Sequence, residues 1–243
     1  MQHLGQTRSA YRTNHLLQTP DTFVRSPLPG MQKAVAIVHT APARGAQFAQ
    51  YTVEFEAGGL LAPARSQRFV YVLDGDVETN GAKLSRGGYA YFPAGHAASI
   101  FANLPARAAI IEKEYQLLPA VAAPAYFTGR ECDIPASSLN GDEGLLVRAL
   151  IPEHPSFDFA VNLMTYAPGA ALPMVEIHVM EHGLLMLEGG GIYRLGDDWY
   201  PVAAGDFIWM APFCPQWFGA IGKTPAKYLI YKDWNRAPMA NTG

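Results

Sequence analysis

Short apolar runs bounded by glycine or proline recur along this chain. In the first half, the run at 69–77 is followed by a glycine-led run at 87–96. In the second half, a run at 184–189 is followed by another at 205–212. Runs of this length between turn residues are typical of strands in small antiparallel β-barrels. The pattern therefore predicts an all-β protein with very little helix.

The same order of glycine turn, strand, turn and strand occurs twice. The second copy follows the first by about 110 to 120 residues, which is close to one domain length. We therefore expect one barrel at 30–117 and another at 145–243, joined by a segment at 118–144 that is rich in Pro, Ala, Gly and Ser. Residues 1–29 are expected to form an N-terminal arm, which must dock on the protein to be ordered.

Composition narrows the class of protein. The chain has 243 residues and a formal net charge of −3, so it lacks the basic field that phosphate backbones require, and nucleic-acid binding is not expected. No run of about 18 apolar residues and no apolar leader core is present, so we expect neither a membrane span nor export. Cys132 and Cys214 are far apart and show no pairing motif. These features predict a cytoplasmic protein.

Candidate metal chemistry is concentrated between residues 176 and 216. Alternate side chains of a strand share a face, so Glu176, His178 and His182 can point into one cavity if the segment is extended. Gln216 could bring a fourth, neutral oxygen from a later strand. Two imidazoles and two oxygens suit a divalent ion of intermediate hardness and leave open positions for a ligand. The alternative is that the histidines are structural, but a buried carboxylate is costly unless it is paired or bound to a metal.

The surrounding motifs carry a family resemblance. Gly169 followed by Glu176-x-His178-x-x-x-His182 is similar to the first cupin motif with carboxylate and imidazole exchanged in order. The segment 205–216 is similar to the second cupin motif, with Gln216 in place of its last histidine. With these two changes to the cupin motifs, the sequence resembles the (S)-ureidoglycine aminohydrolases, a two-cupin (bicupin) family of purine and allantoin breakdown. Further segments that carry the resemblance are 183–189, 191–195, 198–202 and 231–233. The resemblance covers essentially the whole chain.

The resemblance implies a reaction and a set of site residues. It implies one Mn²⁺ per chain, held by Glu176, His178, His182 and Gln216, with substrate contacts from Glu176, Tyr193 and Lys232. The implied reaction converts (S)-ureidoglycine to (S)-ureidoglycolate and releases ammonia. The residues alone leave other roles open, because Tyr193 could simply fill the barrel mouth and Lys232 could be an exposed lysine at a strand end. Trp209, Trp217, Phe213 and Met210 are expected to form walls of the pocket.

The first half of the repeat is expected to have lost its ligands. It offers Arg65, Gln67 and residues near Tyr71 where the second half offers ligands, and arginine cannot ligate a cation. His96 is interpreted as a loop histidine. The N-terminal barrel would then serve packing and assembly. We expect a homo-oligomer, because exposed sheet edges are commonly covered by a neighbouring subunit.

Two other functions remain open at this stage. A cupin dioxygenase or an oxalate-degrading enzyme would use a similar ligand set and would consume oxygen. A non-catalytic bicupin that binds a small molecule would need no metal.

Overall fold

The structure, a computed structural model, describes residues 6–236 and is built almost entirely of β-strands. Within that range it contains no α-helix and only three short 3-10 helices, η1 (Pro20–Thr22), η2 (Pro42–Arg44) and η3 (Glu131–Asp133). The all-β prediction is confirmed. No helix among these residues is long and apolar enough to cross a membrane. Residues 1–5 of the expected arm and 237–243 of the expected C-terminal barrel lie outside the described range.

The described chain divides into two compact units by its internal contacts. Unit 1 contains residues 6–23, 135–153 and 158–236, and unit 2 contains residues 24–134 and 154–157. The division near residue 134 falls inside the segment 118–144, which was expected to be only a connection. That segment carries β12, η3 and β13 and the beginning of β14.

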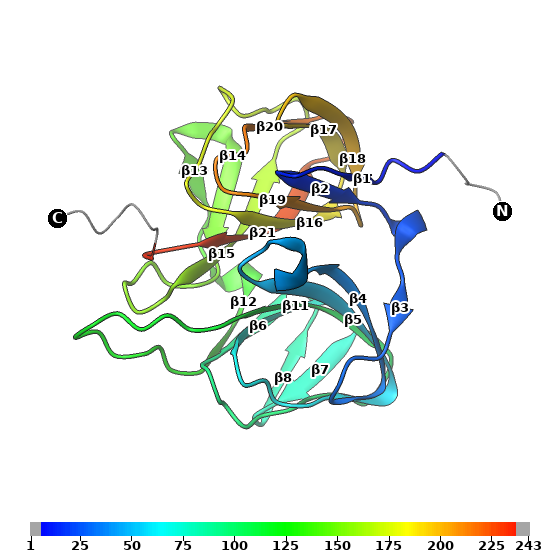
Figure 1. Cartoon of the computed structure of the whole chain (residues 1–243), viewed down its shortest axis with the longest axis vertical. Coiled ribbons are helices and arrows are strands. Elements are labelled where there is room, and N and C mark those ends of the chain that lie inside the picture. The colour runs from blue at the N-terminus through cyan, green and yellow to red at the C-terminus, as the bar shows by residue number, and fades with distance from the viewer. Residues whose placement is uncertain (1–5, 237–243) are drawn as a thin grey trace. The chain divides into compact units, whose positions relative to one another are not determined.

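Unit 1 contains two antiparallel sheets (Figure 1). The larger has the order β1-β2-β19-β16-β21-β15-β14-β13, and the smaller has the order β18-β17-β20. The strands are β1 (Ala10–Tyr11), β2 (His15–Gln18), β13 (Ser137–Leu139), β14 (Asp142–Ala149), β15 (Phe159–Tyr166), β16 (His182–Glu188), β17 (Gly190–Leu195), β18 (Asp198–Ala203), β19 (Phe207–Met210), β20 (Gln216–Ala220) and β21 (Ala226–Asp233). Their alternating side chains form one buried core.

The core of unit 1 follows the period of two that the sequence shows. On β16, Leu184 and Met186 are buried in the cluster that also contains Tyr193 and Phe218. The Tyr193 and Phe218 rings lie 5.4 Å apart between centroids. Burying a side chain of this size contributes about 1.5–3 kcal/mol. The same alternation continues to His182 at the start of β16, so the strand that builds the core also directs a polar side chain inward.

The N-terminal arm docks on unit 1. Its strand β2 pairs antiparallel with β19, as Figure 1 shows at the edge of the sheet. Arg8 forms a two-pronged ion pair with Asp206, at 2.6 Å from Nη1 to Oδ2 and 2.9 Å from Nη2 to Oδ1. Asp206 is fully buried and also accepts a hydrogen bond from the Ala203 backbone N–H. The arm is therefore anchored to unit 1 by the ion pair between Arg8 and the buried Asp206 carboxylate.

Arg8→Ala is expected to destabilise unit 1, because it leaves the buried Asp206 carboxylate without its counter-charge. A hydrogen-bonded charge of this kind contributes about 1.5–3 kcal/mol. The control is Arg12→Ala, which removes the solvent-exposed pair between Arg12 and Asp198 and should cost less than about 1 kcal/mol. Urea unfolding of both variants measures the difference. Equal midpoints for the two variants would contradict the anchoring role of Arg8.

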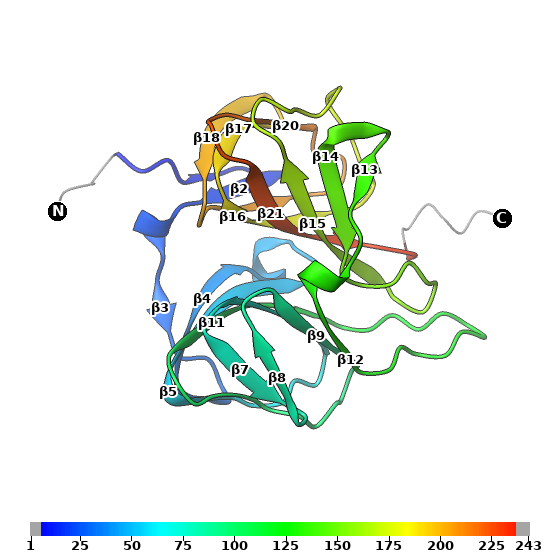
Figure 2. The same cartoon turned by 180° about the vertical axis from the view of Figure 1, so that it is seen from behind.

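Unit 2 is a second antiparallel assembly (Figure 2). Its main path is β12-β9-β6-β11-β5-β10-β7-β8, and β4 pairs with both β3 and β5. The strands are β3 (Arg25–Ser26), β4 (Met31–Thr40), β5 (Ala49–Leu61), β6 (Gln67–Asp74), β7 (Asp76–Thr79), β8 (Ala82–Ser85), β9 (Gly88–Phe92), β10 (Ile100–Ala102), β11 (Ala106–Lys113) and β12 (Phe127–Arg130). The apolar run at 69–77 is broken at Gly75, whose φ of +69° favours glycine.

An ion pair occupies the place in unit 2 that corresponds to His182 in unit 1. In unit 1, His182 on β16 pairs in register with Lys232 on β21. In unit 2, Arg68 on β6 pairs in register with Glu112 on β11. The Arg68 Nη2 atom lies 2.6 Å from Glu112 Oε1. A buried guanidinium therefore stands where unit 1 presents an imidazole.

The sequence-based prediction did not name Arg68 for this position. The prediction named Arg65, Gln67 and residues near Tyr71, but Arg65 is exposed, and Gln67 accepts a hydrogen bond from Tyr91. The core face of β6 is carried by its even-numbered residues, including Val70 and Val72. Register between paired strands places Arg68 there, and the spacing of the repeat agrees, because Arg68 precedes Gly75 by seven residues as His182 precedes Gly189. His96 stacks on Tyr126 at 5.0 Å between ring centroids.

Candidate active site

Unit 1 encloses a cavity of about 300 Å³. This volume suits a small molecule with a few polar groups. The cavity is lined from β13, β14, β15, β16, β17, β20 and β21, from the loop between β14 and β15, and from the segment between β15 and β16. Its polar lining residues are Ser137, Ser138, Glu153, Asn162, Tyr166, Glu176, His178, His182, Tyr193, Gln216, Tyr228 and Lys232. All six residues predicted from the sequence as ligands or substrate contacts are among them.

The Glu176–His178 segment reaches the cavity without forming a strand. Glu176 exchanges two backbone hydrogen bonds with Gln216, at 2.8 and 2.9 Å, and the His178 carbonyl accepts from the Phe213 backbone N–H at 2.7 Å. Residues 177–181 make no strand pairing, so the expectation of an extended strand through the whole motif is wrong. Backbone hydrogen bonds to residues 213 and 216 hold the segment instead, and the Glu176 and His178 side chains line the cavity.

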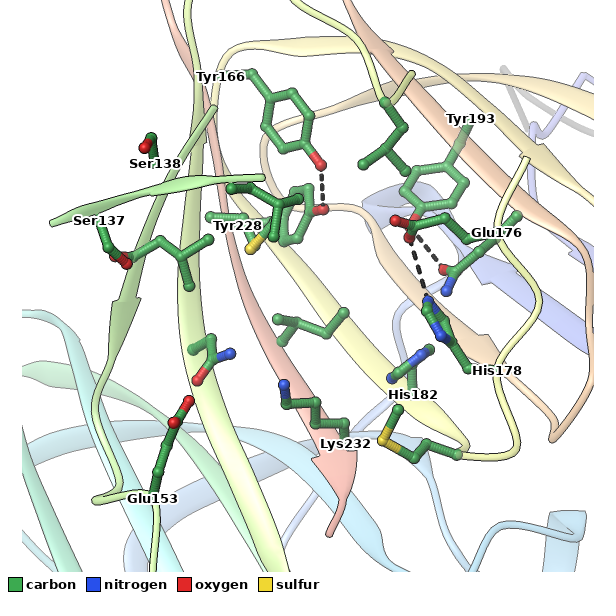
Figure 3. A pocket seen from close by; sticks show the side chains of 18 residues that line it. Ser137, Ser138, Glu153, Tyr166, Glu176, His178, His182, Tyr193, Tyr228 and Lys232 are labelled. Carbon is green, nitrogen blue, oxygen red and sulfur yellow. Dashed lines mark hydrogen bonds and ion pairs between the residues drawn. The ribbon is translucent and has the colours of Figure 1, made fainter. Parts of the chain in front are cut away.

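Glu176, His178 and His182 lie on one side of the cavity (Figure 3), and Gln216 also lines the cavity. His178 Nε2 lies 3.2 Å from Glu176 Oε2, and the His178 and His182 rings are 5.3 Å apart between centroids. Gln216 Oε1 accepts a hydrogen bond from the Tyr193 hydroxyl at 3.2 Å. Within residues 6–236, however, no group of three or more His, Cys, Asp or Glu side chains has the arrangement of a metal site. Glu176 and His178 contact each other here.

His182 has the properties of an available ligand. Its side chain is buried, and neither ring nitrogen has a hydrogen-bond partner of normal geometry among the described residues. The Tyr231 backbone has only a weak effect, which raises the pKa of the His182 ring. Burial lowers the pKa of His182 to about 3. The imidazole is therefore neutral at pH 7 and keeps a lone pair free. An unpaired buried imidazole beside a carboxylate, a second imidazole and an amide fits a divalent metal.

Lys232 supplies a cation next to this group. It lies beside His182 in the β16–β21 ladder, and its Nζ atom is 4.3 Å from the centre of the Trp234 ring. Burial lowers the pKa of Lys232, and the Glu153 carboxylate acts in the opposite direction. In the view of Figure 3, Lys232 lies between the histidines and Glu153. The interpretation of Lys232 as an ordinary exposed lysine is wrong, because its side chain lines the cavity.

Tyr193 is buried and belongs both to the core and to the cavity lining. Burial raises its pKa well above the ordinary value, so the phenol keeps its proton. That proton is directed to Gln216. Tyr193 therefore fills the barrel and also orients a predicted ligand, while its predicted contact with the substrate stays a prediction.

The expected aromatic walls lie elsewhere. None of Trp209, Trp217, Phe213 and Met210 lines the cavity. The Trp209 indole donates to Glu181, and the Trp217 indole donates to the Leu172 carbonyl. Phe213 is exposed. These aromatics stabilise the strands and loops around the site instead of forming its surface.

The sequence reasoning missed six polar cavity residues: Ser137, Ser138, Glu153, Asn162, Tyr166 and Tyr228. The Tyr166 and Tyr228 hydroxyls are 2.8 Å apart. A signal was present for Tyr228, because residues 228, 230 and 232 share one face of a strand and Lys232 had been identified. Glu153 lies in a loop, for which periodicity gives no direction.

Comparisons with known proteins place this geometry in context. The family model of the cupin domain matches residues 162–231. The chain is 39% identical over 242 residues to the probable (S)-ureidoglycine aminohydrolase of Oryza sativa subsp. japonica, covering 97% of this chain and 78% of that protein. It is also 39% identical over 243 residues to the (S)-ureidoglycine aminohydrolase of Arabidopsis thaliana, covering 97% of this chain and 80% of that protein.

Solved structures agree with the fold. The putative glyoxylate induced protein of Pseudomonas aeruginosa superimposes with a TM-score of 0.87 at 30% identity, covering 98% of this chain and 94% of that one. A mutant of the oxalate decarboxylase of Bacillus subtilis superimposes with a TM-score of 0.71 at 15% identity, covering 95% of this chain and 80% of that one. The second likeness concerns the fold alone.

Proposed function

The chain belongs to the (S)-ureidoglycine aminohydrolase family, and we propose that it hydrolyses (S)-ureidoglycine to (S)-ureidoglycolate and ammonia. The observation that carries the proposal is the convergence of Glu176, His178, His182, Gln216 and Lys232 on one small cavity. In this reaction water adds to the α-carbon, the C–N bond to the amino group breaks, and a proton from water leaves with the amine. The site must therefore bind a carboxylate, hold a ureido group and move one proton.

We propose that Glu176, His178, His182 and Gln216 hold one Mn²⁺ ion per chain. Support comes from the donor types and from the neutral, unpartnered imidazole of His182. Glu176 and His178 must turn from their mutual contact toward the ion. When bound, the ion supplies a positive charge with open positions that a substrate carrying a carboxylate and a ureido carbonyl can chelate. Tyr193 keeps Gln216 oriented through its hydroxyl.

The remaining chemistry falls to two side chains. Lys232, held in a largely desolvated position, can pair with the substrate carboxylate, and a bound anion would favour its protonated form. The Glu176 carboxylate has two oxygens, so one can serve the ion while the other accepts a proton from water and passes it to the departing amine. Holding substrate and proton acceptor in one small cavity removes much of the entropic cost of their encounter.

The proposal extends to the arrangement of the chain. We propose that unit 2 is a second cupin barrel whose site has been replaced by the Arg68–Glu112 ion pair, which makes the protein a bicupin with one metal. Its antiparallel sheet and the matching strand registers support this. We also propose a homo-oligomer that covers exposed sheet edges.

The test of the function compares ammonia release with oxygen use. Purified protein given freshly generated (S)-ureidoglycine should release one ammonia per substrate while an oxygen electrode records no consumption. The alternative, an oxygen-using cupin enzyme, predicts oxygen uptake with its own substrate and no ammonia from ureidoglycine. Absence of ammonia release from metal-loaded protein would reject the proposed activity.

Lys232→Met is expected to reduce kcat/KM for ammonia release by roughly 10- to 150-fold, the equivalent of one charge-assisted hydrogen bond. Methionine keeps most of the apolar stem, and the substitution removes a desolvated charge, so metal content and thermal stability should be retained. Lys223→Met changes an exposed lysine on a loop outside the cavity and serves as the control. Full activity of Lys232→Met would exclude Lys232 from substrate binding.

A further inference from the structure

We propose that the side-chain amide of Asn162 recognises the ureido group of the substrate and so sets the specificity of the site. The inference rests on the proposed function, because it assigns one part of that substrate to a residue with no role in the account above. Strand β15, which pairs with the β21 strand that carries Lys232, has no assigned function so far. Asn162 is the polar residue that β15 contributes beside Tyr166.

The first observation is the burial of Asn162 without a partner. Asn162 has only 9% of its surface exposed and lines the cavity. Among residues 6–236, its side-chain amide makes no hydrogen bond. Its amide atoms are not among the fully buried polar atoms that lack a partner, so they reach the open space of the cavity. An amide that protein groups leave unpaired and that faces a cavity is available to a ligand there.

The second observation is the apolar setting of this amide. In the ladders on either side of β15, Asn162 pairs in register with Ala149 on β14 and Ile230 on β21. Met164, the next residue of β15 on the same face, also lines the cavity. None of these neighbours can satisfy an amide with its side chain. An apolar residue at 162 would pack equally well, so packing does not explain the choice of asparagine.

The side chain of Asn162 is chemically complementary to a ureido group. A carboxamide offers one acceptor oxygen and two N–H donors on one planar group. A ureido group offers the same set, so the two can form a pair of parallel N–H···O hydrogen bonds. Lys232 pairs with Ala160, two residues before Asn162 on β15. Diagonal neighbours of this kind lie about 7–8 Å apart, within reach of a small substrate that spans both. Lys232 then takes the carboxylate and Asn162 the ureido end.

The test measures binding of two stable probes to the metal-loaded protein by titration calorimetry. N-Carbamoylglycine carries both a carboxylate and a ureido group but lacks the amino group that leaves. Glycolate carries the carboxylate but lacks the ureido group. Asn162→Leu and Asn162→Ala should each raise the Kd of N-carbamoylglycine by roughly 10- to 100-fold, the loss of two neutral hydrogen bonds. Both variants should leave the Kd of glycolate within about twofold of the wild-type value.

Two controls exclude a merely structural role. Met164→Leu changes the neighbouring cavity residue without removing a polar group, and its ratio of the two Kd values should equal that of the wild type. Asn162→Leu should not lower Tm, because the amide makes no hydrogen bond to the described residues. A residue retained for packing would show a clear loss of Tm on substitution.

The outcomes separate this inference from the proposed function. If the wild type releases ammonia but the Asn162 variants bind N-carbamoylglycine normally, or lose both probes equally, Asn162 does not recognise the ureido group and only this inference fails. If the wild type neither releases ammonia nor binds N-carbamoylglycine, the proposed function and this inference fail together. Selective loss of N-carbamoylglycine binding confirms the assignment.

Discussion

Glu176→Gln is expected to lower kcat for ammonia release by about 100- to 10,000-fold, the range typical of losing a positioned general base. Glutamine has nearly the shape of glutamate, so the backbone pairing with Gln216 remains. The substitution removes the charge that faces His178 and with it the proposed proton acceptor. Turnover should be measured at matched metal occupancy, so that weaker metal binding is not counted as slower chemistry. The expected order of loss is Glu176→Gln, then Lys232→Met, then Tyr193→Phe.

The matched control for this change is Glu143→Gln, a carboxylate-to-amide substitution at an exposed position of β14. It should leave kcat unchanged. A Glu176→Gln protein with metal bound and near wild-type kcat would show that the proton moves through another group. Tyr193→Phe removes one neutral hydrogen bond to Gln216 and should therefore cost the least of the three.

His182→Leu is expected to weaken metal binding by more than about 100-fold, because loss of even an outer-shell partner commonly costs 10- to 100-fold. Metal content after dialysis measures this loss directly. Gln216→Ala should lose less metal than His178→Ala, since an amide oxygen is a neutral and weak ligand. Retention of a full equivalent of metal by His182→Leu would remove His182 from the site.

The same variant should stabilise the metal-free protein. His182 buries two ring nitrogens without a hydrogen-bond partner of normal geometry in the described chain, so leucine removes a desolvation cost and Tm should rise by about 2–4 °C. The control is His15→Leu. His15 is equally buried, but it bonds to Tyr200 and Asn14, so its loss should lower Tm and leave the metal in place. Opposite signs at these two histidines would distinguish a ligand from a structural residue.

The acid stability of the metal-free protein is an independent test of the burial of the His182 imidazole. In the unfolded chain the imidazole binds a proton below its ordinary pKa of 6.5, whereas burial lowers the folded pKa to about 3. The unfolded state therefore binds more protons in this window, and the metal-free protein loses stability as pH falls from 6.5 toward 3. His182→Leu should show a shallower loss over the same range.

Strand content could be predicted from the sequence because apolar and polar residues alternate with a period of two. The 184–189 run became the core of β16, and the turn at Gly75 divided the 69–77 run into two strands. The path of residues 177–181 could not be predicted, since it depends on backbone bonds to Phe213 and Gln216, more than 30 residues away. Local pattern does not report such partners.

The residues of the candidate site could likewise be predicted from the sequence only in part. Residue chemistry and spacing identified Glu176, His178, His182 and Gln216, and the structure brings them to one cavity. Asn162 escaped notice because an asparagine in an apolar strand has no motif, and only the ladder with β21 shows that it faces the cavity. Arg68 was missed although the repeat indicates it, because it precedes Gly75 by seven residues as His182 precedes Gly189. The strand registers show the same correspondence.

The central claim is that this cavity hydrolyses (S)-ureidoglycine with the help of a bound metal. The most direct measurement follows ammonia and the stereochemistry of the product from freshly generated (S)-ureidoglycine, using protein that has been stripped with a chelator and then resupplied with Mn²⁺. We predict no enzymatic release from the stripped protein, and ammonia with (S)-ureidoglycolate in equal amounts after Mn²⁺ is restored. Undiminished turnover by the stripped protein, or no turnover by the reloaded protein, would contradict the account.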